Sequence, residues 1–432
     1  MRYSLRNIPS LLFSPVGRSQ IKRGVLRVAW PLTSSLARVY REVMIPRTRL
    51  VAVVGTFGKT TTTRAIAAAM DNCPNSGLRD NHHSYLAQMI LRTSPGQRDL
   101  VIEVGISKPG QMAPYARLLK PDVTVVTSLG SEHQRSLGTR ERAREEKAAM
   151  VRALGPEGLA VLNGDDPDVR WMAGQTRARI VTFGFSPGND LWARDIRLEW
   201  PKGTAFVVEA GGRALPARIK LIGRHMVYAA LAALAVAAAN GIPLEEALTR
   251  LARLKPTPGR MEPVWLENGA CLLRDDFKSA FETYDAALDV LAKVPARRRI
   301  AVMGDISEPP GKQGEVYRRL GRTSGEIAAR VLYLGEKFET LAVGCRQAGL
   351  PRWALTDCRK SVQKAIQALA GDLADGDVVL IKGRTEQRLG RIALGLAGRE
   401  VRCDLKTCYA MSTPCERCGM LERGWTRFKP AA

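Results

Sequence analysis

The chain has 432 residues, of which 45% are hydrophobic and 25% charged, a composition typical of globular proteins rather than disordered ones. Its 66 Lys and Arg residues outnumber its 42 Asp and Glu residues and leave a formal net charge of +24. That excess favours anionic partners, whether nucleotides, phosphorylated substrates, nucleic acid or an acidic membrane face. Aromatic residues make up only 6%, which counts against a base-stacking surface as the main function.

Residues 1–49 are strongly basic, with ten Lys or Arg residues against a single acid, Glu42. Apolar residues from Val25 to Tyr40 are interspersed among them, as in an amphipathic helix that lies on anionic lipid. The alternative is a solvated helix that packs on the main body. Pro31 should interrupt a continuous helix in either case.

From residue 50 the pattern becomes one of alternating strands and helices. Short apolar runs predict buried strands, with helical patterns between several of them, at 50–54, 100–104, 123–127, 160–162 and 180–183. This order predicts a parallel α/β sheet with both faces covered. We therefore expect the α/β fold class, with a central P-loop domain whose sheet is mainly parallel.

Two helices are expected at 222–239 and 244–254, at the end of the P-loop domain. After Pro256 a second α/β unit begins, in which a hairpin turns at Asn268-Gly269, a helix is expected near 284–292, and further strands are expected at 300–303, 331–334 and 378–381. This unit should form a second, Rossmann-like C-terminal domain. The expected organisation is a basic segment at 1–49, a P-loop domain at 50–262, a C-terminal α/β domain at 263–400 and a cysteine-rich tail at 401–432.

The first motif with clear chemistry lies between the strand at 50–54 and a helix. It reads Gly55-Thr56-Phe57-Gly58-Lys59-Thr60-Thr61. Glycines let backbone N–H groups approach phosphate oxygens closely, and the helix N-terminus adds positive potential. Lys59 should reach the β- and γ-phosphates, and the Thr60 hydroxyl should bind Mg²⁺. The cofactor-binding candidates of this loop are Gly55, Thr56, Gly58, Lys59, Thr60 and Thr61.

This form of the loop resembles that of the Mur ligase family, which joins amino acids or peptides to a carboxylate using ATP. Further blocks follow in the family's order over roughly residues 50–390. They are Val101–Gly105, which is similar to the MurF branch, Thr127–His133, Leu162–Asp166, Gly223–His225, Gly259–Glu262, Asp275-Asp276 and Gly304–Glu308. Each block is weak by itself, whereas the ordered set is specific.

The resemblance implies that ATP phosphorylates a carboxylate and that an amine then attacks the acyl phosphate. It implies that Glu103 and His133 bind Mg²⁺ together with Thr60, and that Lys59, Lys147 and His133 are catalytic. Lys147 stands where the family has a carbamylated lysine. The nucleotide would also contact Asn163, Arg260 and Asp276, so that the site closes only when the two α/β domains come together.

Simpler interpretations remain for three of these residues. Glu103 would otherwise be a buried, paired acid, and His133 a loop histidine without a ligand. Lys147 lies in a run of charges on an expected helix from Thr139 to Ala153, and such a run is usually a solvated face.

The length of the N-terminal segment bears on the substrate. Only 49 residues precede the phosphate-binding strand, too few for the domain with which wall-building relatives hold a UDP-sugar. A cell-wall-precursor-like or lipid-linked carboxylate and an amino acid or peptide amine are therefore expected. The protein is expected in the cytoplasm. Peripheral binding at the inner face of the membrane is the alternative. The rivals are a nucleic-acid-binding P-loop ATPase, with nucleic acid the less favoured partner, and a non-catalytic scaffold.

The tail holds four cysteines, at 403, 408, 415 and 418. Four thiolates satisfy tetrahedral Zn²⁺, and Cys415-x-x-Cys418 resembles half of a zinc ribbon. Cys403, Cys408, Cys415 and Cys418 are therefore candidate zinc ligands. An Fe–S cluster and free thiols are the alternatives.

Overall fold

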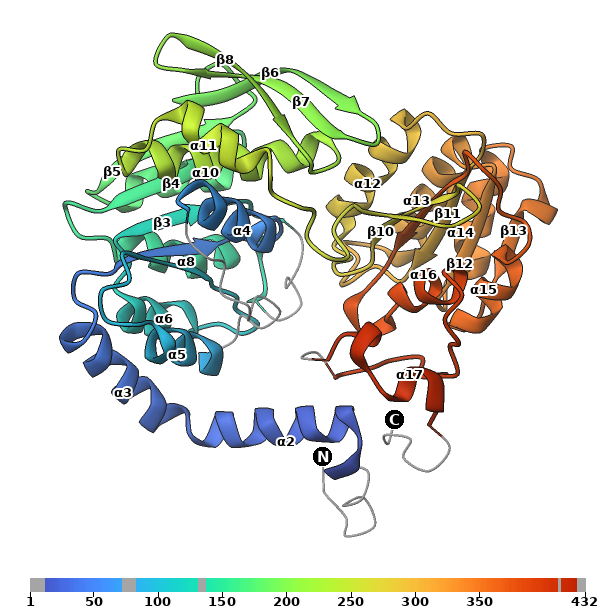
Figure 1. Ribbon diagram of the computed structural model, residues 1–432, viewed down its shortest axis with the longest axis horizontal. Helices are drawn as coiled ribbons and strands as arrows, with labels where there is room; N and C mark the ends of the chain where they lie inside the picture. Colours follow the sequence, from blue (N-terminus) through green and yellow to red (C-terminus); the bar gives the residue numbers. More distant parts are fainter. Residues whose placement is uncertain (1–11, 72–82, 131–136, 411–412, 426–432) are drawn as a thin grey trace. The chain divides into compact units, whose positions relative to one another are not determined.

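The structure of the chain, a computed structural model, describes residues 12–71, 83–130, 137–410 and 413–425 (Figure 1). Residues Val28–Pro256 form one compact unit. The described parts of Met1–Arg27 pack with those of Thr257–Ala432 as a second unit. Each unit has its own sheet, and both sheets are mostly parallel, so the predicted α/β fold class is confirmed.

The first unit contains an eight-stranded sheet in the order β2-β1-β3-β4-β5-β6-β7-β8. Its strands are β1 (Arg49–Val54), β2 (Asp99–Glu103), β3 (Val123–Val126), β4 (Leu159–Asn163), β5 (Arg179–Gly184), β6 (Leu191–Glu199), β7 (Gly203–Ala210) and β8 (Arg213–Ile219). The first five match the five predicted strands, and they pair in parallel. Strands β6 to β8 form an antiparallel extension that the apolar runs did not predict.

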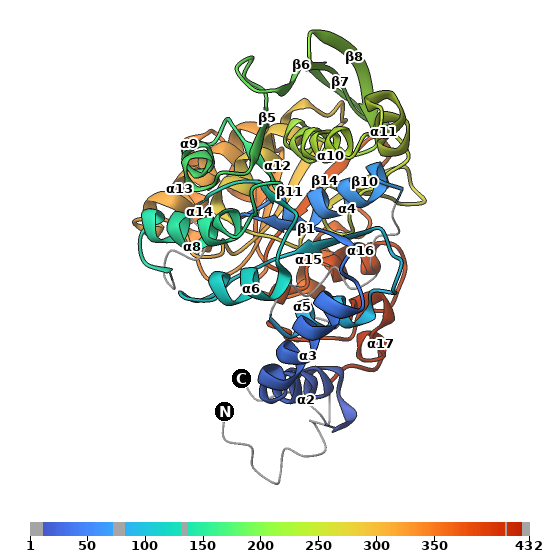
Figure 2. The ribbon, with the colours of Figure 1, turned by 90° about the vertical axis from the view of Figure 1, so that its left-hand side faces the viewer.

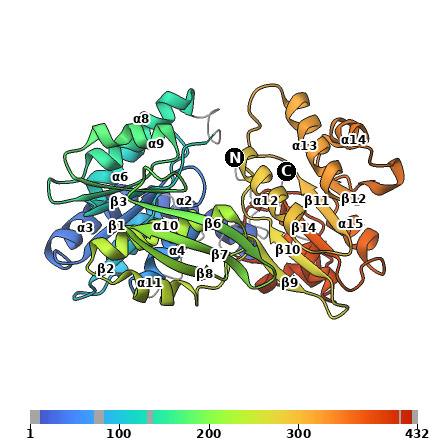
Figure 3. The same ribbon diagram turned by 90° about the horizontal axis from the view of Figure 1, so that it is seen from above.

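Helices cover both faces of this sheet (Figure 3). One face carries α4 (Lys59–Ala69), α10 (Val227–Ala239) and α11 (Leu244–Leu251). The other carries α3 (Trp30–Val43), α5 (His83–Arg92), α6 (Met112–Leu119) and α8 (Arg140–Arg152). The short elements α9 (Pro167–Trp171), η2 (Met172–Gln175) and η3 (Arg224–Met226) complete the unit. Because β1 lies between covered faces, Leu50 through Val54 are fully buried.

The second unit contains a six-stranded sheet in the order β13-β12-β11-β14-β10-β9. Its strands are β9 (Glu262–Trp265), β10 (Cys271–Asp275), β11 (Arg299–Gly304), β12 (Arg330–Leu334), β13 (Leu355–Asp357) and β14 (Val378–Lys382). Strands β9 and β10 are antiparallel around Asn268-Gly269, where the hairpin was predicted. The other pairs are parallel.

Helices α12 (Phe281–Lys293), α13 (Gln313–Ile327) and α14 (Phe338–Gln347) pack together in this unit. Helices α15 (Val362–Leu369) and α16 (Gly390–Leu396) contribute to a core with the apolar side chains of the sheet. The remaining short elements are η4 (Arg352–Ala354), η5 (Thr385–Gln387), η6 (Cys415–Arg417) and α17 (Met420–Arg423).

The basic segment forms two helices, α2 (Pro15–Val28) and α3, rather than one. Pro31 lies in the first turn of α3, where a missing N–H costs no helical hydrogen bond. Val16 of α2 is buried in a small apolar cluster of the second unit with Cys403, Leu405, Ala410 and Trp425. Helix α3 instead packs beside α5 and α6 of the first unit (Figure 2).

Within the described residues, no helix combines the length and apolar character needed to cross a bilayer.

Candidate active site

The loop between β1 and α4 has a backbone shape that only glycine accepts at two positions. Gly55 has φ 143° and Gly58, the residue before α4, has φ 84°. A Cβ atom on Gly55 would lie 2.1 Å from Thr127 Oγ1, so the segment after β3 leaves no room for a side chain. The loop therefore presents its N–H groups at the N-terminus of an eleven-residue helix, which is the arrangement that binds phosphate.

Two hydroxyl side chains after β3 hold this loop in shape. Thr127 Oγ1 donates to the carbonyl oxygen of Phe57 at 2.7 Å. The N–H of Phe57 donates to Ser128 Oγ at 3.1 Å, and that of Thr56 donates to the carbonyl oxygen of Ser128 at 2.9 Å. Residues after β3 therefore hold the phosphate loop in its binding shape before a ligand arrives.

Two lysines contact Thr56. Lys59 Nζ donates to the carbonyl oxygens of Gly55 and Thr56 at 2.9 and 3.0 Å. Lys147 Nζ lies 3.4 Å from Thr56 Oγ1, which also accepts the N–H of Gly130 at 3.0 Å. Both ammonium groups are therefore close to the place where the loop would hold phosphate oxygens.

Lys147 is only 2% exposed. Thr139 caps α8 by accepting the N–H of Arg142, and the helix turns Lys147 inward with Ala143 and Met150. The interpretation of this lysine as part of a solvated face is therefore wrong. Its burial beside the loop fits the role that the family resemblance implies.

Thr60 and Glu103 form a hydrogen-bonded pair in which Thr60 Oγ1 donates to Glu103 Oε2 at 2.7 Å. Both side chains are buried, Thr60 in the first turn of α4 and Glu103 at the end of β2. A hydroxyl and a carboxylate are hard oxygen donors, which Mg²⁺ prefers. The two residues predicted as metal ligands are thus brought together. His133, the third predicted ligand, lies outside the described residues.

The remaining nucleotide candidates of this unit have supporting roles in the structure. Asn163, at the end of β4, donates to the carbonyl oxygen of Thr127 at 2.9 Å and accepts the N–H of Asp165 at 3.1 Å. Asn163 therefore braces the segment that fixes the phosphate loop. Thr61 is buried in α4, directly after Thr60.

A cluster around Asp165 was not predicted. Tyr228 donates to Asp165 Oδ2 at 2.9 Å, its ring lies 4.0 Å from that of Phe185, and Arg224 lies over Phe185 at 4.7 Å. Burial and the neighbouring Asp165 charge both raise the pKa of Tyr228, so the phenol stays protonated as a donor. The only sequence signal was that two of the ordered blocks contain Asp165 and Arg224, far apart in the chain.

The second unit holds the other two predicted residues. Arg260 lies over the ring of Phe277 at 4.8 Å. Asp276 accepts from Arg274 at 3.1 Å. Beside them, the buried Lys382 forms an ion pair with Asp275 at 2.6 Å. Burial lowers the pKa of Lys382, although Asp275 opposes that shift. Lys382 was noted in the sequence only as part of a Lys-Gly pair.

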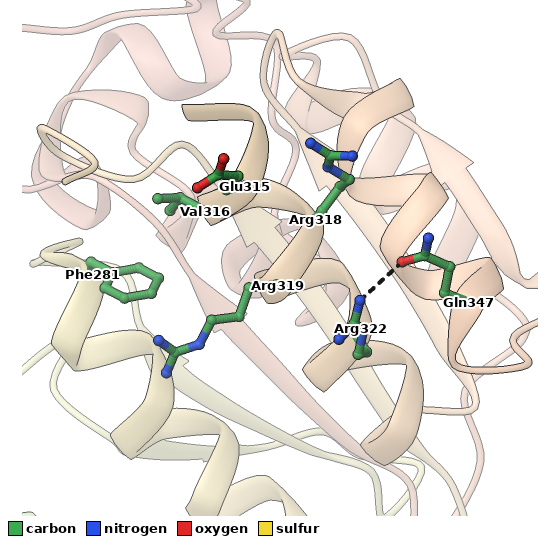
Figure 4. Close-up of a pocket in the computed structure, with 7 residues that line it drawn as sticks. All are labelled: Phe281, Glu315, Val316, Arg318, Arg319, Arg322 and Gln347. Carbon is green, nitrogen blue, oxygen red and sulfur yellow. Dashed lines mark hydrogen bonds between the residues drawn. The ribbon is translucent and has the colours of Figure 1, made fainter. Parts of the chain in front are cut away.

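A separate cavity of about 570 Å³ lies along α13 and contains none of the predicted residues (Figure 4). Arg319 lies over Phe281 at 4.9 Å and pairs with Asp285, while Arg322 donates to Gln347. Two of the three arginines that line the cavity, Arg319 and Arg322, are therefore already bonded to other residues of the fold.

The four tail cysteines line one small cavity. Cys403 Sγ accepts from Trp425 Nε1 and from Arg391, each at 3.1 Å. Burial raises the pKa of Cys415 to about 12. Over the described part of the chain, however, no group of three or more His, Cys, Asp or Glu side chains is arranged to hold a metal ion. The predicted zinc site at Cys403, Cys408, Cys415 and Cys418 is therefore not supported.

The fold and the loop together define a nucleotide-binding α/β protein of the P-loop class. Residues 53–237 match the model of the Mur ligase middle domain, and residues 259–385 match that of the Mur ligase glutamate ligase domain. Together the two matches cover most of the chain, and the protein belongs to the Mur ligase family, whose members are ATP-dependent amino-acid ligases.

Curated relatives point to the MurF branch. The UDP-N-acetylmuramoyl-tripeptide--D-alanyl-D-alanine ligase of Bacillus subtilis is 26% identical over 368 residues, which cover 84% of this chain and 78% of the relative. The ligase of the same name from Escherichia coli is 27% identical over 300 residues, which cover 68% of this chain and 66% of the relative.

Solved structures agree in fold. MurF from Acinetobacter baumannii has a TM-score of 0.74 at 21% identity and covers 86% of this chain and 81% of its own. MurF ligase from Thermotoga maritima, solved in complex with ADP, has a TM-score of 0.73 at 24% identity and covers 85% and 83%.

Proposed function

We propose that this ligase joins the carboxylate of a cell-wall-precursor-like peptide to the amine of an amino acid or dipeptide, through an acyl phosphate. The observation that carries the proposal is the phosphate loop itself. It combines N–H groups at the start of α4, two buried lysines beside Thr56, and the Thr60–Glu103 pair.

The reaction has two balanced steps. A carboxylate oxygen attacks the γ-phosphorus of ATP, the bond to the β–γ bridging oxygen breaks, and ADP leaves. The amine then attacks the acyl carbon, an amide forms, inorganic phosphate departs, and the amine loses a proton. Negative charge accumulates on the transferring phosphoryl group, so fixed donors around it lower the barrier.

In this scheme Lys59 exchanges its bonds to the loop carbonyls for bonds to phosphate oxygens. The Gly58–Lys59 backbone supplies N–H donors at the helix N-terminus. Lys147 acts beside the Thr56 hydroxyl, either as a cation or, as the family position implies, as a carbamate. Arg260 and Asp276 of the second unit, and Asn163 of the first, remain proposed nucleotide contacts.

Thr60 and Glu103 would hold Mg²⁺, with His133 as a further proposed ligand. The oxygen donors fit that ion. When bound, Mg²⁺ would neutralise charge on the phosphate oxygens. The reaction consumes ATP, and we place it in the cytoplasm.

The names of the relatives suggest the first substrates to test. Both curated relatives are ligases of UDP-N-acetylmuramoyl-tripeptide and D-alanyl-D-alanine. The chain differs from the family pattern after Asp275-Asp276, where it reads Phe277-Lys278-Ser279-Ala280-Phe281, and such a change suggests a different substrate. Lipid-linked carboxylates and other amines therefore belong in the same screen.

The test is phosphate release from ATP in the presence of each carboxylate and amine, alone and together. Ligation requires that release depend on both partners and that a new amide appear by mass spectrometry. Lys59→Ala should abolish turnover, whereas Lys120→Ala, a change at an exposed lysine of the same unit, should not. Release stimulated by DNA or RNA and indifferent to amines would instead identify a nucleic-acid-dependent ATPase.

A further inference from the structure

Large exposed apolar side chains gather in one part of the described chain. Ten of them lie between residues 12 and 44, whereas only Ile180, Trp265, Trp353 and Tyr409 are found elsewhere. The ten are Leu12, Phe13, Ile21, Val25, Val28, Leu32, Leu36, Val39, Val43 and Met44. Single exposed apolar residues are ordinary, but a concentrated set marks an interaction surface.

On α3 the exposed residues form a single line, which we call the α3 stripe: Leu32, Leu36, Val39 and Val43. Their spacing of three and four residues places them on one helix face. They are 75%, 56%, 57% and 67% exposed, respectively. Four branched aliphatic side chains in succession face outward.

The opposite side of α3 fixes this orientation. Ala37 is fully buried, and Tyr40 donates its hydroxyl to the carbonyl oxygen of Thr93 at 2.9 Å. Arg41 is buried and pairs with Asp122 at 3.1 Å. Asp122 Oδ2 also accepts the N–H of Leu50 at 2.7 Å, at the start of β1. The helix therefore cannot rotate its stripe inward without losing these bonds.

Helix α2 has the same character. Ile21 and Val25 are exposed one turn apart, while Val16 is buried and Arg23 donates to the carbonyl oxygen of Tyr409 at 3.0 Å. One end of α2 is thus anchored to the tail, and its outer apolar residues remain exposed.

The charges around these residues are almost all positive. The exposed cations of the two helices and the following turn are Arg18, Lys22, Arg27, Arg38 and Arg47. The only acid in the whole segment is Glu42, which pairs with Lys120. An apolar helix face among basic side chains is the pattern that inserts into the headgroup region of anionic lipid.

We propose that α3 docks on an anionic bilayer surface, with the α3 stripe inserted among the acyl chains and the basic side chains of the segment at the phosphate level. A second copy is the less suitable occupant, because helix pairs of this kind need charges of both signs along the seam. Two copies of this segment would bring like charges together.

The test is vesicle flotation of the full chain. Vesicles of phosphatidylcholine and phosphatidylglycerol in equal parts should carry the protein, and vesicles of phosphatidylcholine alone should carry far less. Because the anchor combines apolar burial and charge, Leu32→Glu with Val39→Glu should weaken binding about tenfold or more. Trp353→Glu removes an 80% exposed apolar side chain outside the segment and should leave binding unchanged.

Charge reversal separates the two contributions. Arg27→Glu with Arg38→Glu should weaken binding to the anionic vesicles about tenfold, and added salt should do the same to the unaltered chain. Circular dichroism of each variant checks that the helices persist. Lys59→Ala should bind vesicles normally, so a failure of the ligase proposal would leave this one standing.

Three results would overturn the proposal. They are equal flotation with neutral vesicles, full binding by the Leu32→Glu/Val39→Glu variant, and a dimer in light scattering that the same variant abolishes. The last result would assign the stripe to a second copy of the chain.

Discussion

The two units place buried cations beside different groups in the contacts that the structure describes. Among the contacts described for the first unit, Lys59 donates to carbonyl oxygens of its own loop, and Lys147 Nζ lies 3.4 Å from the Thr56 hydroxyl. In the second, Lys382 and Arg274 are paired with the carboxylates of Asp275 and Asp276. A phosphate oxygen can replace a carbonyl oxygen at little cost, whereas a buried ion pair resists exchange. Substitutions at the phosphate loop of the first unit should therefore affect chemistry, and those at the buried ion pairs of the second should affect stability.

The largest expected effect is at the Lys382–Asp275 pair. Lys382→Met leaves a buried carboxylate without its cation and should lower the free energy of unfolding by about 3–5 kcal/mol. Denaturant unfolding measures this change. Lys364→Met, at an exposed position of α15, should stay within about 0.5 kcal/mol. Equal stability of the two variants would break the contrast between the units.

Thr60→Val tests the chemical half of the comparison. It removes the hydroxyl that bonds Glu103, and it should lower the rate of ADP formation about a hundredfold or more while the fold persists. Thr63→Val is the matched control, since the Thr63 hydroxyl bonds only the Lys59 carbonyl of its own helix among the contacts described. Similar losses in both variants would show that the helix, rather than the Thr60–Glu103 pair, matters.

Asp377 should make the stability of the second unit depend on pH. Burial would raise its pKa, but hydrogen bonds from Arg298 and Arg297 outweigh burial and lower the pKa to about 2. In the unfolded chain this carboxyl titrates at about pH 3.9. The ionised Asp377 therefore stabilises the fold fully above that pH, and the stabilisation is lost as the pH falls to about 2.

Asp377→Asn should therefore cost about 2 kcal/mol at neutral pH and much less near pH 2. Thermal unfolding as a function of pH measures the difference. Asp375→Asn, an exposed neighbour, should follow the unaltered chain. A constant gap between Asp377→Asn and the unaltered chain at every pH would contradict the assignment.

Tyr228→Phe should have the smallest effect. It removes one hydrogen bond to Asp165 and keeps the ring contact with Phe185, so the loss of unfolding free energy should be about 1 kcal/mol. Parallel titration of ATP affinity shows whether the cluster also contacts the nucleotide. A loss above about 3 kcal/mol would mean that the hydroxyl holds more than Asp165.

The parts that sequence predicted well are those whose geometry is local. The buried strand, the two glycines and the following helix place Lys59 and Thr60 without reference to the rest of the chain. Glu103 was predicted for two reasons. It lies at the carboxyl end of a parallel strand, and its block occurs in the order that the family shows. Lys147 was ambiguous because charge pattern alone does not show which side of α8 faces the loop, and packing decided it.

The parts that were missed depend on distant contacts. Strands β6 and β8 carry several charged residues on an antiparallel extension, so they lack the apolar runs that revealed β1 to β5. The Asp165–Tyr228 contact joins positions 63 residues apart. The four tail cysteines have spacing suited to a ligand set, yet side-chain placement, which spacing does not specify, decides whether sulfur atoms converge.

Asp122 gives α3 a mechanical connection to the nucleotide strand. One carboxylate oxygen holds both Arg41 of α3 and the N–H of Leu50 in β1. Asp122 Oδ2 thus links α3 directly to the strand that leads into Gly55. Displacement of α3 at a membrane surface would therefore act on the start of β1 through Asp122.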